Sequence, residues 1–313
     1  MLMQLRIATM VVVSVVGACE LNAQTVAPKF AWPAGSSATM VMEMRSKSSG
    51  GAAGMDISDS SATRLTFDYE IRAHPEGLEI VQGRGVVERL VPSSRPQPVD
   101  AAGISALGAR YIIAKDGKFI RLSDMAEQKR RMDSVMAPIV EQVRQMAPAM
   151  LPTIERSSSP DALTAMMQKA HESAYELLYN RSWTKGDSVS TSTTMPSPIS
   201  PATSMVIPRV VRFDGVVPCP DSTRRTCWQF TSRTVISRET MRPALVEMLK
   251  TMGMSESMID QVPISESTSI TTNVVDASTM LPLRVESKTV GSGASSLVSV
   301  QTNTSLIVTY RWK

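Results

Sequence analysis

Aromatic residues are scarce in this sequence, and methionine is abundant. Phe, Tyr and Trp together make up 4% of the 313 residues, whereas Met occurs 22 times. Methionine therefore has to fill core volume that aromatic rings usually fill. Flexible thioether side chains adapt to irregular spaces, so a core of this kind can also line a site that accepts variable acyl chains.

Histidine is scarcer still, and the motifs of common enzymes are missing. His171 precedes Glu172, but the second His of a zinc-protease motif is absent, so we expect an ordinary histidine on a helix surface. There is no Gly-x-Ser-x-Gly elbow and no Gly-rich phosphate loop. The sequence thus predicts no catalytic, cofactor-binding or metal-binding residues, although two carboxylates brought together by folding would leave no motif.

Met40, Met42 and Met44 alternate along one short segment, which places their side chains on the same face of a strand. Three thioethers could offer soft ligands to copper(I). No Cys or His accompanies them, so we interpret them as core residues and predict no metal site there.

Long apolar runs are absent except at the start of the chain. Arg6 precedes an apolar run over residues 7–16, which is too short to span a bilayer and has the length of a signal-peptide core. Two cleavage sites compete: a signal peptide 1–23, or a lipoprotein signal 1–18 that leaves Cys19 lipidated. We expect an exported bacterial protein that is periplasmic, outer-membrane-anchored or secreted, and membrane-associated only if Cys19 carries lipid.

Cysteine is nearly absent from the remaining chain, which contains two copies. Cys219 and Cys227 flank a polar, turn-rich segment between two strand-like runs. Because export places the chain in an oxidising compartment, the spacing predicts a disulfide that closes a hairpin loop. Two sulfurs without a nearby His do not make a metal site.

The net charge of +4 comes from scattered basic residues. A nucleic-acid-binding protein would show a stripe of Lys and Arg with interleaved aromatic residues. No such stripe is present, so we expect no nucleic-acid partner.

Alternation of apolar and polar residues with period two dominates both ends of the chain. In residues 63–73, Leu65, Phe67, Tyr69 and Ile71 alternate with polar residues, which predicts a half-buried antiparallel strand. Asp116-Gly117 predicts a hairpin turn. In the last third, Ser and Thr alternate with the apolar residues of many strands, and we expect these hydroxyls on solvated sheet surfaces.

The middle of the chain, about 123–180, has helical spacing instead. Pro138 should kink or end the first helix. The Ser159-Pro160-Asp161 sequence is typical of the start of a second helix. The apolar faces of these two helices predict an apolar pocket against the sheet. Its predicted lining residues are Met132, Met136, Ile139, Val143, Met166, Met167 and Leu178.

Together these patterns predict a single α+β domain over residues 24–313, mainly β, with a helical insertion at about 123–180. A large curved antiparallel sheet would pack against the two middle helices. This layout resembles the half-barrels of bacterial lipoprotein and lipid carriers in architecture alone, and no functional residue is carried over. We expect an envelope protein that binds an apolar ligand, a lipid or a lipidated partner between sheet and helices. The alternative is a structural or protein-interaction module without a small ligand, and an enzyme is the least favoured class.

Overall fold

The computed structural model describes residues 25–52, 55–93, 106–146, 148, 151–179, 181–196, 204–251, 264–294 and 298–313. The predicted fold class is confirmed: the protein is mainly β, with one large antiparallel sheet and a small set of helices. The leader, both cleavage sites and Cys19 lie outside the described residues, so those interpretations stay predictions.

The large sheet has 12 strands, all paired antiparallel. They are β2 Ser37–Ala52, β3 Met55–His74, β4 Gly77–Gln82, β5 Val86–Val91, β6 Ala109–Ala114, β7 Phe119–Leu122, β9 Ser188–Pro196, β10 Ser204–Cys219, β11 Ser222–Ile236, β12 Glu266–Asp276, β13 Pro282–Ala294 and β14 Val298–Trp312. A separate pair joins β1 Thr25–Val26 to β8 Trp183–Thr184.

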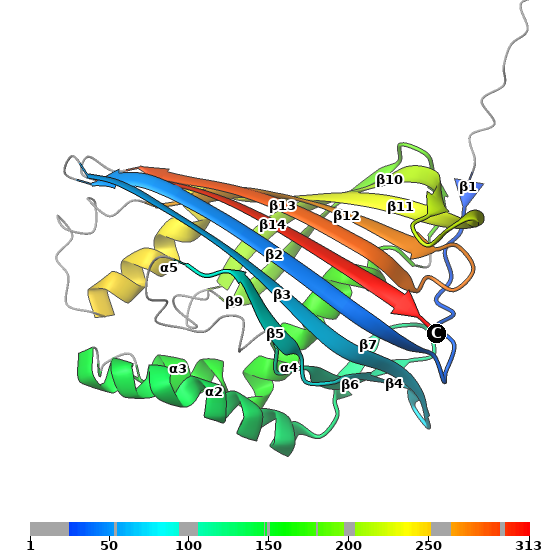
Figure 1. The fold of residues 1–313 in the computed structure, drawn as a ribbon, viewed down its shortest axis with the longest axis horizontal. Helices are drawn as coiled ribbons and strands as arrows, with labels where there is room; N and C mark the ends of the chain where they lie inside the picture. Colours follow the sequence, from blue (N-terminus) through cyan, green and yellow to red (C-terminus); the bar gives the residue numbers. More distant parts are fainter. Residues whose placement is uncertain are drawn as a thin grey trace, which may run out of the picture.

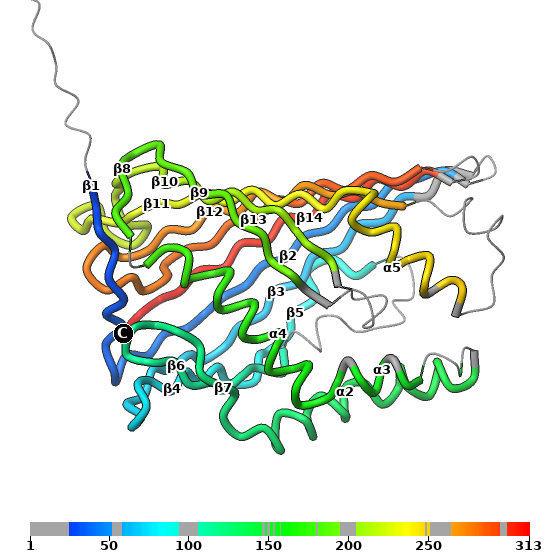
Figure 2. Tube along the Cα trace, turned by 180° about the vertical axis from the view of Figure 1, so that it is seen from behind, coloured from blue at the N-terminus to red at the C-terminus, as the bar shows by residue number. Residues whose placement is uncertain are grey.

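The strand order is β7-β6-β4-β3-β2-β14-β13-β12-β11-β10-β9, with β5 paired to β3. Strands from the first part of the chain therefore form one half of the sheet, and strands from the last part form the other. The two halves meet where β2 pairs with β14. Figures 1 and 2 show that the sheet curves around the helices and does not close on itself.

The helical insertion contains more pieces than the sequence predicted. They are α2 Met125–Met146, α3 Leu151–Ser157, α4 Pro160–His171 and a π-helical turn, η2, Glu172–Glu176. The start of α4 is as predicted, because the Ser159 hydroxyl accepts a hydrogen bond from the Ala162 backbone N–H at 3.3 Å. A further helix, α5 Arg238–Thr251, follows β11.

Of the two effects expected of Pro138, a kink or an end of the first helix, the second is wrong. Helix α2 continues through Pro138 as far as Met146. Both Pro138 and Ser134, the residue four positions before it, are exposed. The carbonyl that loses its helical donor at a proline can therefore hydrogen-bond to water.

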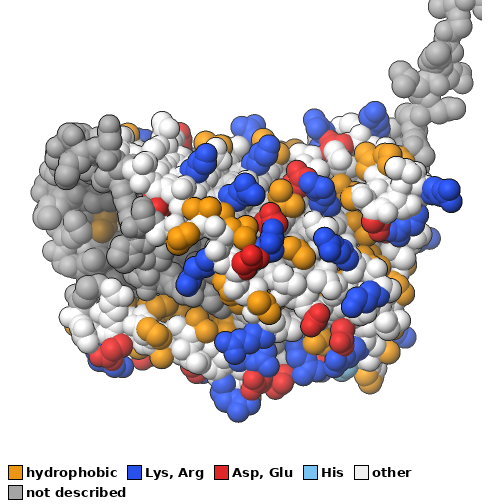
Figure 3. Space-filling view, viewed as in Figure 1, with side chains coloured by type: hydrophobic (Ala, Val, Ile, Leu, Met, Phe, Trp, Pro, Cys, Tyr) orange, Lys and Arg blue, Asp and Glu red, His pale blue; other side chains and the backbone are white. Residues whose placement is uncertain are grey.

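The two faces of the sheet differ in chemistry. Leu65, Phe67 and Tyr69 of β3 are at most 4% exposed and point to the concave, helix-covered face. Arg64 points to the opposite face and pairs with Glu43 and Glu88, both at 2.9 Å. Figure 3 shows charged side chains scattered over the visible face with isolated hydrophobic side chains between them. The sequence pattern of β3 predicted this division.

The scarce aromatic residues gather at one end of the molecule. Of the 14 aromatic residues in the sequence, 13 belong to or pack against one core cluster, and Phe67 lies in the neighbouring cluster. We call this part the aromatic end. Its rings come from both halves of the sheet and from η2, for example Tyr69 beside Tyr310 and Trp312, with both pairs of ring centroids 5.7 Å apart. The aromatic end therefore joins the two halves of the sheet.

Candidate ligand chamber between sheet and helices

One row of side chains crosses the concave face at right angles to eight strands. Successive strand pairings align these residues from β9 to β3, and all but one carry a hydroxyl group. We call this set the hydroxyl row. It consists of Thr191, Arg209, Thr234, Ser269, Thr289, Thr304, Ser46 and Ser61.

Side-chain hydrogen bonds run along the hydroxyl row. Thr289 donates to Ser269 at 3.0 Å, and the hydroxyls of Ser46 and Thr304 lie 3.3 Å apart. Ser287, one position nearer the aromatic end, connects Ser269 at 3.2 Å with Thr271 at 2.9 Å. These bonds use part of the hydrogen-bonding capacity of the hydroxyl groups. Each hydroxyl can still donate or accept a further hydrogen bond with a ligand or water.

The hydroxyl row lies on the same face as the buried core residues, and not on the opposite face to which the sequence pattern assigned the Ser and Thr residues of many strands. Each of its members is half-buried and lies on the concave face. The pattern misled because period two shows which residues share a face, but not which face the helices cover. These hydroxyls thus lie on the same face of the sheet as the buried core residues.

The concave face changes character along its strands. Two positions nearer the aromatic end, the aligned residues include Phe213, Phe230, Val308 and Met42. The first two are 0% exposed, and Val308 is 6% exposed. Met40 is also a buried core residue, 3% exposed, as its sequence pattern predicted. The hydroxyl row is thus a polar band, with fully buried apolar residues toward the aromatic end and, on β10, the buried Ile207 and Met205 on its other side.

Arg209 is the charged member of the hydroxyl row. It is half-buried, and its aligned neighbours on either side are Thr191 and Thr234. Its guanidinium donates a hydrogen bond to the backbone carbonyl of Ser173 in η2. Burial lowers the pKa of the Arg209 guanidinium. Arginine keeps its charge at neutral pH despite such a shift, so a fixed positive charge lies inside the concave face.

The predicted pocket residues on α2 lie along one face of the helix. Met132 packs against the aromatic end, and Met136, Ile139 and Val143 continue that face in the direction of the opposite end. Among the described α2 side chains, residues 125–145, none is buried. Figure 2 shows α2 running beneath the sheet beyond the part that α4 covers. The apolar face of α2 is therefore only partly covered.

The other predicted pocket residues lie on or just after α4. Leu178 is 1% exposed and belongs to the core, Met167 packs against the same core, and Met166 is 53% exposed. The structure therefore places Leu178 and Met167 in the core of the aromatic end and leaves Met166 exposed.

His171 is buried, contrary to the expectation of a surface histidine. It is 3% exposed, and its Nε2 donates to the Gly117 carbonyl at 2.7 Å. Its ring packs against Tyr111 and Tyr175, with centroids 5.7 and 5.2 Å apart. Burial lowers the pKa of His171 and raises that of Tyr111. Both groups are therefore neutral at pH 7, and His171 fixes α4 to the β6–β7 hairpin.

Gly117 allows this hairpin to lie close to the Phe30 ring. It adopts φ +88°, a left-handed conformation that favours glycine, and a Cβ there would lie 2.7 Å from the Phe30 ring. The Asp116-Gly117 hairpin predicted from the sequence thus also supplies the carbonyl that His171 binds.

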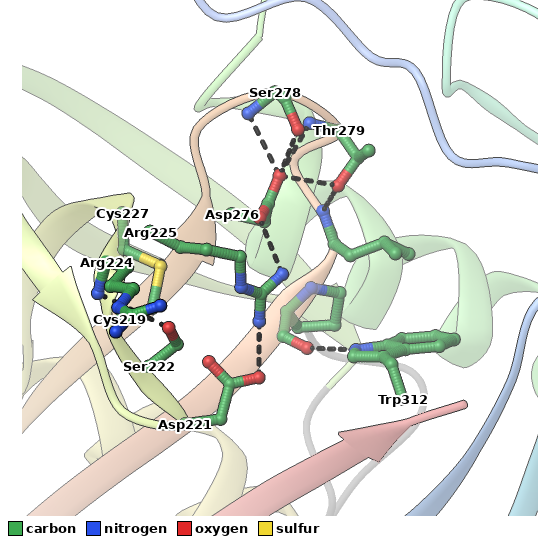
Figure 4. A network of polar contacts seen from close by, with 12 residues as sticks. Cys219, Asp221, Ser222, Arg224, Arg225, Cys227, Asp276, Ser278, Thr279 and Trp312 are labelled. Carbon is green, nitrogen blue, oxygen red and sulfur yellow. Dashed lines mark hydrogen bonds and ion pairs between the residues drawn. A yellow bond between two sulfur atoms is a disulfide. The ribbon is translucent and has the colours of Figure 1, made fainter.

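The predicted disulfide between Cys219 and Cys227 is present at the β10–β11 turn. Beside it, Arg225 contacts both Asp221 and Asp276, as Figure 4 shows. Asp276 also accepts hydrogen bonds from the backbone and hydroxyl groups of Ser278 and Thr279. These bonds lower the pKa of Asp276 against the opposing effect of its burial. This network fixes two turns to each other.

A polar hollow of about 750 Å³ lies at the other end of the long strands. Its lining combines Lys47 and Asn303 from one face of the sheet with Ser48 and Thr302 from the other. Because it extends around both faces, it is an open rim and offers a ligand less enclosure than the concave face.

Two further observations concern the described residues as a whole. No three His, Cys, Asp or Glu side chains in the described ranges gather closely enough to hold a metal ion. Among the described helices, none combines the length and hydropathy that a membrane crossing requires.

Comparison with known proteins gives no family. No family model matches the chain, and no curated protein matches it. One similar solved structure is entitled lipid–protein interactions in lipovitellin. The similarity covers 90% of this chain and 26% of that protein, at 6% sequence identity and a TM-score of 0.42. An outer membrane channel from Pseudomonas putida F1 is similar over 91% of this chain and 100% of its own, at 10% identity and a TM-score of 0.23. These likenesses are too weak to support a functional argument.

Proposed function

We propose that the protein binds an apolar ligand, such as a lipid or the acyl chain of a lipidated partner, between the concave face and the helix layer. The observation that carries this proposal is the partly covered apolar face of α2, which includes Met136, Ile139 and Val143. Apolar helix faces are normally buried against a core. A helix of 22 residues without a buried side chain in its described range leaves that surface for a ligand.

The energetic argument supports the same proposal. Completely burying a Met or Ile side chain contributes roughly 1.5–3 kcal/mol, and a half-buried side chain has gained only part of this. A ligand that covers the apolar face of α2 would add the rest of this burial free energy at several positions of the helix. Methionine side chains adjust to acyl chains of different length, because they are flexible and unbranched.

We further propose that the protein works in an oxidising compartment of a bacterial envelope or outside the cell. The Cys219–Cys227 disulfide supports this location, since such bonds persist mainly outside the reducing cytosol. The apolar run of residues 7–16 is the second support, because it has the length of a signal-peptide core. The proposal includes no enzymatic step.

Lipid extraction and binding of a fluorescent fatty acid test the proposal. Protein purified without detergent should carry extractable lipid or bind the probe saturably. Met136→Trp should fill space beside α2 and weaken binding by about tenfold, equivalent to roughly 1.4 kcal/mol. Ser134→Trp is the matched control, because Ser134 is exposed on the same helix, and it should bind like the unmodified protein.

A protein-interaction module without a small ligand is the alternative, and the outer face of the sheet favours it. Val206 and Val290 are 55% and 57% exposed there, and Ile270 is 48% exposed. If the purified protein carries no lipid and shows no saturable binding of any acyl probe, the binding proposal is wrong and the interaction function takes its place.

A further inference from the structure

Arg209 lacks an anionic partner within the described part of the chain. No ion pair joins its guanidinium to any Asp or Glu of the described residues, and the contact that it makes is with the neutral Ser173 carbonyl. Glu172, the neighbour of Ser173 in η2, is already paired with Lys169 at 2.7 Å. Among the described residues, the Arg209 charge on the concave face therefore has no opposite charge beside it.

Such a charge is costly without compensation. Moving a guanidinium out of water is unfavourable unless hydrogen bonds and an opposite charge replace its hydration. One N–H of Arg209 donates to Ser173, whereas an arginine side chain has five N–H groups arranged in a planar fork. The remaining donors can bind a carboxylate or phosphate in a bidentate arrangement.

The residues around Arg209 also favour the binding of a carboxylate or phosphate. Thr191 and Thr234 align with it on the neighbouring strands, and both are half-buried. Their hydroxyls can donate further hydrogen bonds to an anionic group. Val189, which is half-buried on β9 and pairs with Val211 of β10, offers partly exposed apolar surface one inward-facing position from the row. A molecule with an acidic head and an apolar chain would match both surfaces.

We propose that Arg209, with Thr191 and Thr234, forms the site for the acidic headgroup of an amphiphile whose apolar chain lies along the concave face toward α2. This inference rests on the proposed function and specifies its ligand class as acyl-bearing carboxylates or phosphates. The headgroup supplies the negative charge that the described part of the protein does not place beside Arg209.

Radiolabelled palmitate and its neutral alcohol, hexadecanol, test the inference, because they share one apolar chain and differ in charge. The unmodified protein should bind palmitate more tightly than hexadecanol. Arg209→Gln should weaken palmitate binding by about 10–100-fold, the range for a charged hydrogen bond, and should leave hexadecanol binding within about twofold. Arg209→Lys keeps the charge and should retain part of the preference for palmitate.

Arg212→Gln is the matched control. Arg212 lies on the same strand but on the opposite face, where it pairs with Asp214 at 2.7 Å and its side chain is 58% exposed. This variant should bind both probes normally. Thermal unfolding monitored by circular dichroism shows whether Arg209→Gln still folds. If Arg209→Gln does not fold, the preference for palmitate in Arg209→Lys decides, and its loss would overturn the inference.

The outcomes separate the two proposals. Equal binding of palmitate and hexadecanol by the unmodified protein, or equal weakening of both by Arg209→Gln, would overturn the headgroup site while leaving the apolar chamber intact. If neither probe binds to the unmodified protein, the proposed function itself is wrong.

Discussion

The aromatic end and the hydroxyl row differ in how they are packed, although the same long strands form both. At the aromatic end, residues such as Phe213 and Phe230 are 0% exposed, and their ring centroids lie 5.1 Å apart. In the hydroxyl row, Thr234 and Ser269 are half-buried and hydroxyl groups replace the rings. A sequence poor in aromatic residues can thus place nearly all of them in one tightly packed part of the core. The other region then need not be tightly packed for the fold to be stable.

The largest effect should come from truncating the aromatic end. Phe213→Ala should destabilise the protein by about 3–5 kcal/mol, because the substitution leaves a cavity among buried rings. Thr304→Val in the hydroxyl row should cost about 1 kcal/mol or less, since it removes one side-chain hydrogen bond at a half-buried position.

Urea denaturation of both variants measures these two costs. A similar loss from both substitutions would contradict the idea that stability is concentrated at the aromatic end. Thr39→Val, on the outer face of β2, serves as a control for β-propensity.

Loss of the disulfide should have the next largest effect. Cys219→Ser should lower the free energy of unfolding by roughly 2–3 kcal/mol, because the bond closes a loop with a sequence separation of 8 residues. The double variant with Cys227→Ser should show no further loss, since one substitution already removes the bond. Both unfolding free energies can be compared under non-reducing conditions, and reaction of the folded, unmodified protein with a maleimide would contradict the bond.

Acidification should weaken the aromatic end through His171. Burial holds the pKa of His171 below its unfolded value, so the unfolded chain binds a proton more readily than the folded protein. Stability is therefore full above about pH 6.5 and falls at lower pH, by at most about 1.4 kcal/mol per pH unit for one group. A second proton would go to Nδ1, which is buried without a hydrogen-bond partner in the described structure.

Melting temperatures recorded between neutral and mildly acidic pH measure this dependence. His171→Gln should flatten the curve, because it removes the group whose pKa burial lowers. An unchanged pH dependence in His171→Gln would show that other groups control acid stability.

Much of the fold follows from the sequence because local patterns determined it. Period two in residues 63–73, the Asp116-Gly117 turn and the Ser159 cap all act within a few residues of one another. The Cys219–Cys227 bond was predictable from spacing and compartment. Met40 was recognised as a core residue, although no pattern showed that it pairs with Tyr310 across β2 and β14.

The candidate site was less predictable because it depends on long-range alignment. Arg209 and Ser46 belong to one row, yet four intervening strands separate them in the sheet. A scan for clusters along the sequence cannot find such a row. His171 was missed for a similar reason: helical position alone does not show that the β6–β7 hairpin covers that turn. A useful sequence signal would be an isolated Arg among Ser and Thr at inward-facing strand positions.

The pairing of β2 with β14 has a consequence for how the chain reaches its native state. This pairing joins Ala38 to Trp312, so the central contact of the sheet spans nearly the whole described chain. Contacts of such high sequence separation slow folding, because a large loop must close before they form. Until β14 arrives, β2 has an unpaired backbone edge, which is a template for aggregation. Efficient folding would therefore require that this edge be protected until the last described strand has been added.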